Sequence, residues 1–173
     1  MREGLKTNGE HTMKWFKRIG SAAAVILWYS AIFGFSAQDG EKSGSLSGAV
    51  AEAVMKLFGG DPGGEARHTL EHIIRKGAHM TEFAILALLV FWAVYAWTGV
   101  RNLKAFVIAL ALTVCLASLD EFHQTYVPDR AGRPADVLID SCGALIALAL
   151  LWFILRGKNS SINRRKVSKD MDK

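Results

Sequence analysis

Residues 135–155 read ADVLIDSCGALIALALLWFIL, and this stretch decides the fold. It has about the 20 residues that a helix needs to cross a bilayer, and it is polar only at its start. Three further stretches have the same character: 19–36 carries no charge, 77–98 is polar only in its first turns, and 105–121 is apolar until its end. The sequence therefore predicts an all-α integral membrane protein, a bundle of four transmembrane helices.

Two other interpretations of these stretches stay open. They could be buried core helices of a soluble protein, although four such runs leave little amphipathic sequence to cover them. Residues 19–36 could instead belong to a cleaved signal peptide, because basic residues precede them and the small residues Gly34 and Ser36 end them. Cleavage would leave the topology of the remaining chain unchanged.

The positive charge of the chain is segregated. The formal net charge of the whole chain is +5. Residues 1–18 hold five basic and two acidic residues, and residues 156–173 hold seven basic and two acidic residues. The short connection 99–104 holds two basic residues and no acid. By the positive-inside rule, both tails and this connection are cytoplasmic, which four crossings of 19–155 satisfy. Because the basic residues bracket apolar segments, no nucleic-acid partner is expected.

The connection 37–76 is long enough to have structure of its own. Apolar residues recur at helical spacing from Leu46 to Phe58 and predict an extracytoplasmic amphipathic helix, on the outer leaflet or capping the bundle. Glycine and serine indicate a turn before it, at 40–45, and a flexible corner after it, at 59–64. A docked helix without chemistry is the simpler interpretation of this element.

A polar stripe leads into the second span. Its members are three or four residues apart and share one helix face: His68, His72, Arg75, His79 and Glu82, with Lys76 and Phe83 beside them. A solvated outer turn accounts for His68 and His72. A charge past the membrane boundary is costly, so Glu82 is expected to face protein or water. His79 and Glu82 are therefore functional candidates.

Polar residues also mark the end of the third span and the start of the fourth. Asp120, Glu121 and Gln124 precede a loop, 126–134, that carries arginines and prolines, and Asp136 and Asp140 follow it. Asp140 lies at least one turn inside the membrane and needs a partner, such as Arg130, Arg133, His79 or a metal. Small residues at 143 and 147 would let another helix approach closely. All these groups lie at outer helix ends, which predicts a common cavity.

At these residues the chain resembles the VanZ-like family of small bacterial membrane proteins. The resemblance covers about 20–155 and rests on three motifs: Asp120-Glu121-x-x-Gln124 with Pro128-x-Arg130, Asp136, Asp140 and Gly143; Lys76-x-x-His79-x-x-Glu82-Phe83; and Phe35-Ser36-Ala37-Gln38 with Ser43 and Ser47. The chain departs from the family at Asp129-Arg130, where glycine is expected before the arginine, and at Arg133-Pro134. The resemblance implies low-level resistance to the glycopeptide teicoplanin and no settled biochemical activity.

Three functions stay open for the polar cluster. It could bind a lipid headgroup, a peptidoglycan precursor or an acylated glycopeptide without catalysis. It could be an enzyme that acts on a lipid-linked or cell-wall substrate. It could also be a buried ion-pair network that only locks the helices together.

The enzymatic hypothesis assigns roles to individual residues. The catalytic candidates, which would act as general acid and base, are His79, Glu82, Asp120 and Glu121. The residues expected to bind substrate are Lys76, Gln124, Arg130, Arg133, Asp136 and Asp140. A divalent metal could use His79, Glu82, Asp120, Glu121 and Asp136, although no metal-binding motif is present. The sequence leaves the cofactor, the ligand and the oligomeric state undetermined.

Overall fold

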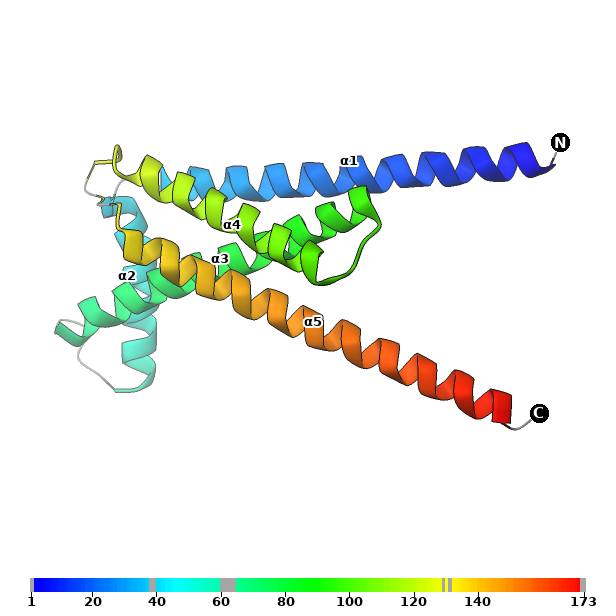
Figure 1. Cartoon of the computed structure of the whole chain (residues 1–173). Coiled ribbons are helices and arrows are strands. Elements are labelled where there is room, and N and C mark those ends of the chain that lie inside the picture. Colours follow the sequence, from blue (N-terminus) through cyan, green and yellow to red (C-terminus); the bar gives the residue numbers. More distant parts are fainter. Residues whose placement is uncertain (1, 38–39, 60–64, 129, 131, 172–173) are drawn as a thin grey trace.

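The computed structural model describes residues 2–37, 40–59, 65–128, 130 and 132–171, and within these residues every regular element is a helix (Figure 1). Side chains are described over 11–37, 47–59, 65–128, 130 and 132–157. The helices are α1 (Arg2–Ser36), α2 (Gly40–Leu57), α3 (Glu65–Thr98), α4 (Leu103–Gln124) and α5 (Pro134–Met171). The predicted all-α fold is confirmed.

Four of these helices are long and apolar enough to cross a membrane, so the chain is a multi-pass membrane protein. The candidate spans are His11–Ser36, Glu65–Thr98, Leu103–Gln124 and Pro134–Gly157. Each contains one predicted span and is longer than it. The polar residues at the span ends continue the helix, because its backbone hydrogen bonds form in water as well as in lipid. The described residues of the two predicted tails likewise belong to α1 and α5.

Helix α3 lies at the centre of the bundle and contacts each of the other four helices. Its buried Phe83 and Leu86 pack in one cluster with Ala117 of α4 and Ala144 of α5. The small alanines let neighbouring helices come close, which is how helices associate in lipid. The large side chains on the outside are apolar too, among them Leu27 of α1, as expected for a surface in contact with lipid.

Helices α3 and α5 approach each other closely at Gly143. A Cβ atom placed on Gly143 would lie 2.6 Å from the Met80 Cγ and would also meet the Met80 carbonyl oxygen. Only glycine fits at this crossing without a shift of one helix. The prediction that a small residue at 143 admits a neighbouring helix is therefore confirmed, and that neighbour is α3.

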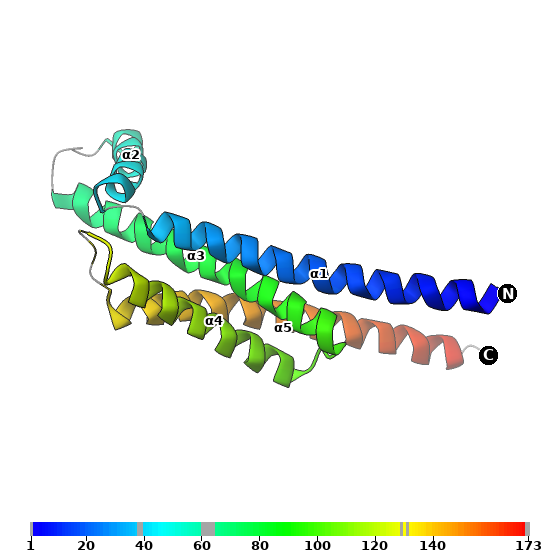
Figure 2. The ribbon, with the colours of Figure 1, turned by 90° about the horizontal axis from the view of Figure 1, so that it is seen from above.

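Helix α2 crosses the first turns of α3, at the end of the bundle opposite the two chain termini (Figure 2). Its buried residues are the small Ser47, Gly48 and Ala51. The large Leu57 and Phe58, at the end of the predicted apolar stripe, are 80% and 82% exposed and face away from the bundle. A helix is present in this connection, as predicted, and its face of small residues is the one that docks on α3.

One expectation for this connection is wrong, and another falls outside the described residues. The predicted turn at 40–45 is helical, since α2 begins at Gly40. Glycine and serine favour turns, but a face of small residues also favours close packing of a helix, and packing on α3 decides here. The predicted corner at 59–64 lies outside the described residues except for Gly59, which has a positive φ of 71° just after α2 ends.

Candidate functional site

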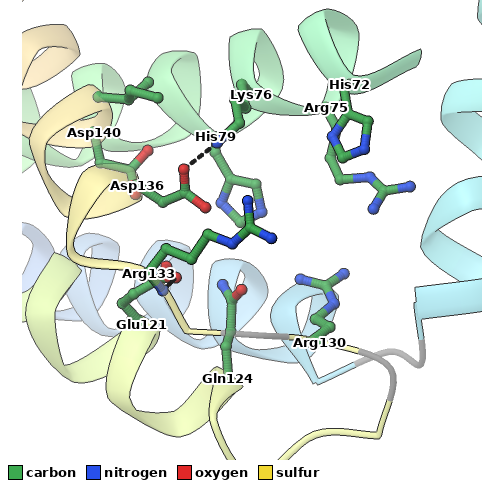
Figure 3. Close-up of a pocket in the computed structure, with 11 residues that line it drawn as sticks. His72, Arg75, Lys76, His79, Glu121, Gln124, Arg130, Arg133, Asp136 and Asp140 are labelled. Carbon is green, nitrogen blue, oxygen red and sulfur yellow. Dashed lines mark hydrogen bonds and ion pairs between the residues drawn. The ribbon is translucent and has the colours of Figure 1, made fainter. Parts of the chain in front are cut away.

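A cavity of about 230 Å³ opens at the α2 end of the bundle (Figure 3). It lies between α3, the last turn of α4, the connection that follows α4, and the first turns of α5. The residues that line it are His72, Arg75, Lys76, His79, Glu121, Gln124, Arg130, Arg133, Asp136, Ile139 and Asp140. The structure thus brings the polar helix ends into one cavity, as the topology predicts.

Most of the predicted site residues line this cavity, but Glu82 and Asp120 do not. Two lining residues outside the predicted site, His72 and Arg75, belong to the polar stripe, and the spacing of three and four residues places them on the same helix face as His79. The apolar Ile139 gave no signal in the sequence that could have identified it.

The central ion pair of the cavity joins Lys76 of α3 to Asp136 of α5. Asp136 lies in the first turn of α5, where a carboxylate also interacts favourably with the helix dipole. Both side chains are partly exposed, at 40% and 30%. This pair connects the two helices at the cavity wall and is open to solvent or to a ligand.

Glu121 connects the end of α4 to the start of α5. Its Oε1 accepts a hydrogen bond of 2.5 Å from the backbone N–H of Arg133, immediately before Pro134 begins α5. The residue is buried and its carboxylate lines the cavity. One oxygen of this catalytic candidate therefore positions the loop, and the other remains available to the cavity.

Asp140 is the deepest carboxylate of the cavity and is only 4% exposed. Among the described residues, none forms an ion pair or a hydrogen bond with it, so the predicted pairing with Arg130, Arg133 or His79 is not formed. A buried carboxylate without a partner is unfavourable in the apolar part of a membrane protein. No cationic side chain among the described residues therefore balances this carboxylate.

Asp120 lies behind the cavity wall and is 1% exposed. Its Oδ2 accepts hydrogen bonds from the Ser36 hydroxyl at 2.8 Å and from the Gln124 amide at 3.0 Å. The first bond joins the end of α1 to the end of α4. Asp120 therefore contacts its neighbours rather than the cavity, which differs from its predicted position among the catalytic groups.

Three arginines lie around the mouth of the cavity. Arg75 is held by Glu71 at 3.0 Å, whereas Arg130 and Arg133 form no ion pair with a described residue. Burial and the nearby positive charge of Arg75 lower the pKa of the Arg130 guanidinium from its ordinary value. The structure thus gathers positive charge at a place where no described carboxylate forms an ion pair with Arg130 or Arg133.

Positively and negatively charged side chains occupy different parts of the cavity. Figure 3 shows the side chains of Arg75 and Arg130 toward one side and those of Asp136 and Asp140 toward the other, with Arg133 reaching between them. Glu121, Gln124 and Asp140 are buried, whereas His72 and Arg133 are exposed. The mouth of the cavity is therefore basic and its floor acidic.

The remaining predicted pair, His79 and Glu82, lies on one face of α3, with His79 Nδ1 3.7 Å from Glu82 Oε2. This distance is longer than a hydrogen bond. Within the part of the chain that the structure describes, no three His, Cys, Asp or Glu side chains lie together in a way that could hold a metal ion. These side chains provide no preformed ligand set for the metal-assisted hypothesis.

Comparison with known proteins identifies a family. The sequence model described as VanZ/LLP1 matches residues 21–156, which include all or most of each of the four predicted apolar segments and every residue that lines the cavity. No curated protein and no solved structure matches the chain.

Proposed function

The chain belongs to the VanZ/LLP1 family, and from this premise we propose that its cavity binds a small anionic group of a lipid-linked or cell-wall-related ligand at the outer face of the cell membrane. The proposal further includes a contribution to resistance against teicoplanin-type glycopeptides, as the family resemblance implies. The chain would bind the ligand without transforming it.

The observation that carries this proposal is the unpaired positive charge of Arg130 and Arg133 at the mouth of the cavity. A guanidinium group binds carboxylates and phosphates through two parallel hydrogen bonds. Arg75, whose charge acts on Arg130, adds to the attraction. Together they favour an anion that arrives from outside the protein.

The size of the cavity limits the ligand. At about 230 Å³ it is smaller than the ~300–1,000 Å³ that is typical of sites for drug-sized molecules. A headgroup or another short polar group fits such a volume, and a whole glycopeptide does not. Resistance would therefore arise through a component of the envelope that the protein binds, rather than through capture of the antibiotic inside the cavity.

The outward orientation of the cavity follows from charge. With both ends of the chain and the connection 99–104 on the cytoplasmic side, that side holds 14 Lys and Arg residues and 4 acids. The membrane and the outer connections hold 7 Lys and Arg residues and 12 acids. Such a bias sets the orientation of multi-pass proteins. The cavity lies at the opposite end of the bundle from the termini and would therefore face outward.

The purely structural hypothesis is less well supported. A network that locks the helices would pair its charges with one another, but in the described cavity only Lys76 and Asp136 form an ion pair between two helices. Arg130, Arg133 and Asp140 remain without such partners. Charged groups that a fold leaves unpaired are better explained by a ligand than by stability.

The enzymatic alternative rests on the buried carboxylates of the floor, Glu121 and Asp140, which could serve as acid and base. Glu121→Gln separates the two functions. Glutamine retains an oxygen that can accept the Arg133 N–H, so the loop is expected to keep its place while the charge is lost. If ligand turnover by the wild-type protein is measured and this variant abolishes it, the binding-only proposal is wrong.

The proposal is tested with the double variant Arg130→Gln/Arg133→Gln of the full chain. We expect it to lose co-purifying anionic lipid or cell-wall precursor in native mass spectrometry, and to lower the teicoplanin concentration that the host cells tolerate. The matched control is Arg101→Gln, which removes a charge that lies over the Tyr95 ring, at 4.0 Å from its centre, at the other end of α3. Equal retention of ligand by both variants would contradict the proposal.

A further inference from the structure

We propose that the ligand carries a primary ammonium group beside its phosphate, so that the acidic floor of the cavity binds the ammonium while the basic mouth binds the phosphate. This inference rests on the proposed function and specifies its ligand class as an aminoalkyl phosphate. Phosphoethanolamine, either free or as the headgroup of a phospholipid, is the simplest member of that class.

The first observation is that Asp140 lacks a partner. Its side chain is 4% exposed, it lines the cavity, and no described residue pairs with it. Removing a carboxylate from water without a compensating charge is costly. A cationic group of the ligand would supply that charge at the depth where the protein itself does not.

The second observation is the number of acceptors on the floor. The Gln124 amide nitrogen donates to Asp120, which can only accept, so the orientation of the amide is fixed and its Oε1 is left without a described partner. Glu121 uses Oε1 for the Arg133 N–H and keeps Oε2. Glu121 and Gln124 therefore each keep one free acceptor beside the two oxygens of Asp140, which is enough for the three N–H donors of a primary ammonium.

The third observation is the separation of charge. Asp136 and Asp140 lie on one side of the cavity and Arg75 and Arg130 on the other, with Arg133 between them (Figure 3). A ligand with a single negative charge would use the mouth alone and leave Asp140 buried and unpaired. A zwitterion whose phosphate and ammonium are joined by a short chain satisfies both ends.

The test compares lipids that differ only at the amine. The full chain in detergent is titrated with dioleoyl phosphatidylethanolamine, with its N-acetyl derivative, and with dioleoyl phosphatidylglycerol, and binding is followed by native mass spectrometry. We expect the wild type to favour phosphatidylethanolamine by about tenfold over both, the effect of one charge-assisted hydrogen bond. Attraction to the arginines alone predicts the opposite order, because the other two lipids carry the greater net negative charge.

The variant Asp140→Asn keeps the shape of the side chain and removes its charge. We expect it to lower binding of phosphatidylethanolamine to the level of the N-acetyl lipid. The matched control is Glu52→Gln, which neutralises a carboxylate that pairs with Lys56 on the exposed side of α2 and lies outside the cavity. If Asp140→Asn keeps the full preference, or if the wild type binds all three lipids equally, the inference is wrong.

The same titration separates this inference from the proposed function. If the wild type binds the three lipids equally and Arg130→Gln/Arg133→Gln weakens that binding, the ammonium site would be overturned. The anion site would then still stand. If none of the three lipids binds, and free O-phosphoethanolamine does not bind either, the aminoalkyl phosphate would be overturned as the ligand class, and the anion site would be judged by the cell-wall precursor that co-purifies with the wild type and not with Arg130→Gln/Arg133→Gln. Displacement of the bound lipid by free O-phosphoethanolamine would support the same chemistry and assign the polar group alone as the ligand.

Discussion

Single hydrogen bonds between distant residues hold the wall behind the cavity. Ser36 and Asp120 are far apart in the chain, yet the hydroxyl of Ser36 donates to the carboxylate at 2.8 Å and both groups are buried. Gln124 approaches the same two groups with its amide nitrogen. A carboxylate that accepts several hydrogen bonds holds its neighbours in fixed positions, so Asp120 positions Gln124 for the cavity.

We predict that Ser36→Ala lowers the stability of the protein, because Asp120 loses one of its two donors. Hydrogen bonds between membrane helices contribute about 0.6 kcal/mol on average and up to about 1.7 kcal/mol, and the upper value is expected for a charged acceptor. Thermal unfolding in detergent measures the change. Ser118→Ala is the control, because the Ser118 hydroxyl is exposed and bonds to the Val114 carbonyl of its own helix. Equal melting temperatures of the two variants would contradict the prediction.

At the scale of the helices, close packing of α3 against α5 forms one wall of the cavity. The helices cross at Gly143 and Met80, one turn beyond Asp140 and next to His79. Any displacement at this crossing would change the distance between the two lining groups. Stability and the geometry of the site therefore depend on the same contact.

We predict that Gly143→Ala destabilises the protein, because the added methyl group would meet the Met80 carbonyl oxygen and its side chain. Overpacking of this kind costs about 1–3 kcal/mol. The control is Gly77→Ala on α3, where a Cβ has no neighbour within 4 Å. That change is expected to be neutral or to stabilise the helix by up to about 1 kcal/mol. Thermal unfolding of both variants decides, and a melting temperature of Gly143→Ala at or above that of Gly77→Ala would show that the crossing is not close.

The elements that the sequence predicted well are those with a periodic signal. The apolar runs identified α1, α3, α4 and α5, and the spacing of the polar residues extended α3 toward His68. Helix α2 was predicted only in part, because a run of glycine and serine favours both a turn and a close helix contact. The choice depended on its packing on α3, which is not encoded in the local sequence.

The sequence predicted which residues gather at the candidate site, but not which of them contact one another. Topology placed the carboxylates and arginines at the same end of the bundle. Whether Asp120 faces the cavity depends on Ser36 of another helix, and whether Asp140 has a partner depends on the path of the loop that carries Arg130. Such contacts are set by tertiary structure, and no spacing rule along one helix determines them.

At the scale of the whole molecule, the two ends of the bundle differ in chemistry. The start of α1 and the end of α5 lie at one end, together with the turn between α3 and α4 (Figures 1 and 2). At this end Arg18 donates to the carbonyls of Ala96 and Trp97, at 3.3 and 3.4 Å. Basic residues commonly hydrogen-bond the last carbonyls of a helix, and here one also ties α1 to α3. The cavity and α2 occupy the opposite end.

This arrangement predicts that reporters after Lys173 and within the connection 99–104 respond alike. The positive-inside rule assigns both to the cytoplasm, since basic residues outnumber acids there. A fluorescent protein that folds only in the cytoplasm should be bright after Lys173, and alkaline phosphatase should be inactive in both positions. Alkaline phosphatase inserted into the connection between α2 and α3 should be active, because α2 and the start of α3 lie at the cavity end. If alkaline phosphatase is instead active after Lys173 and inactive between α2 and α3, the cavity faces the cytoplasm. The ligand would then have to come from the inner leaflet.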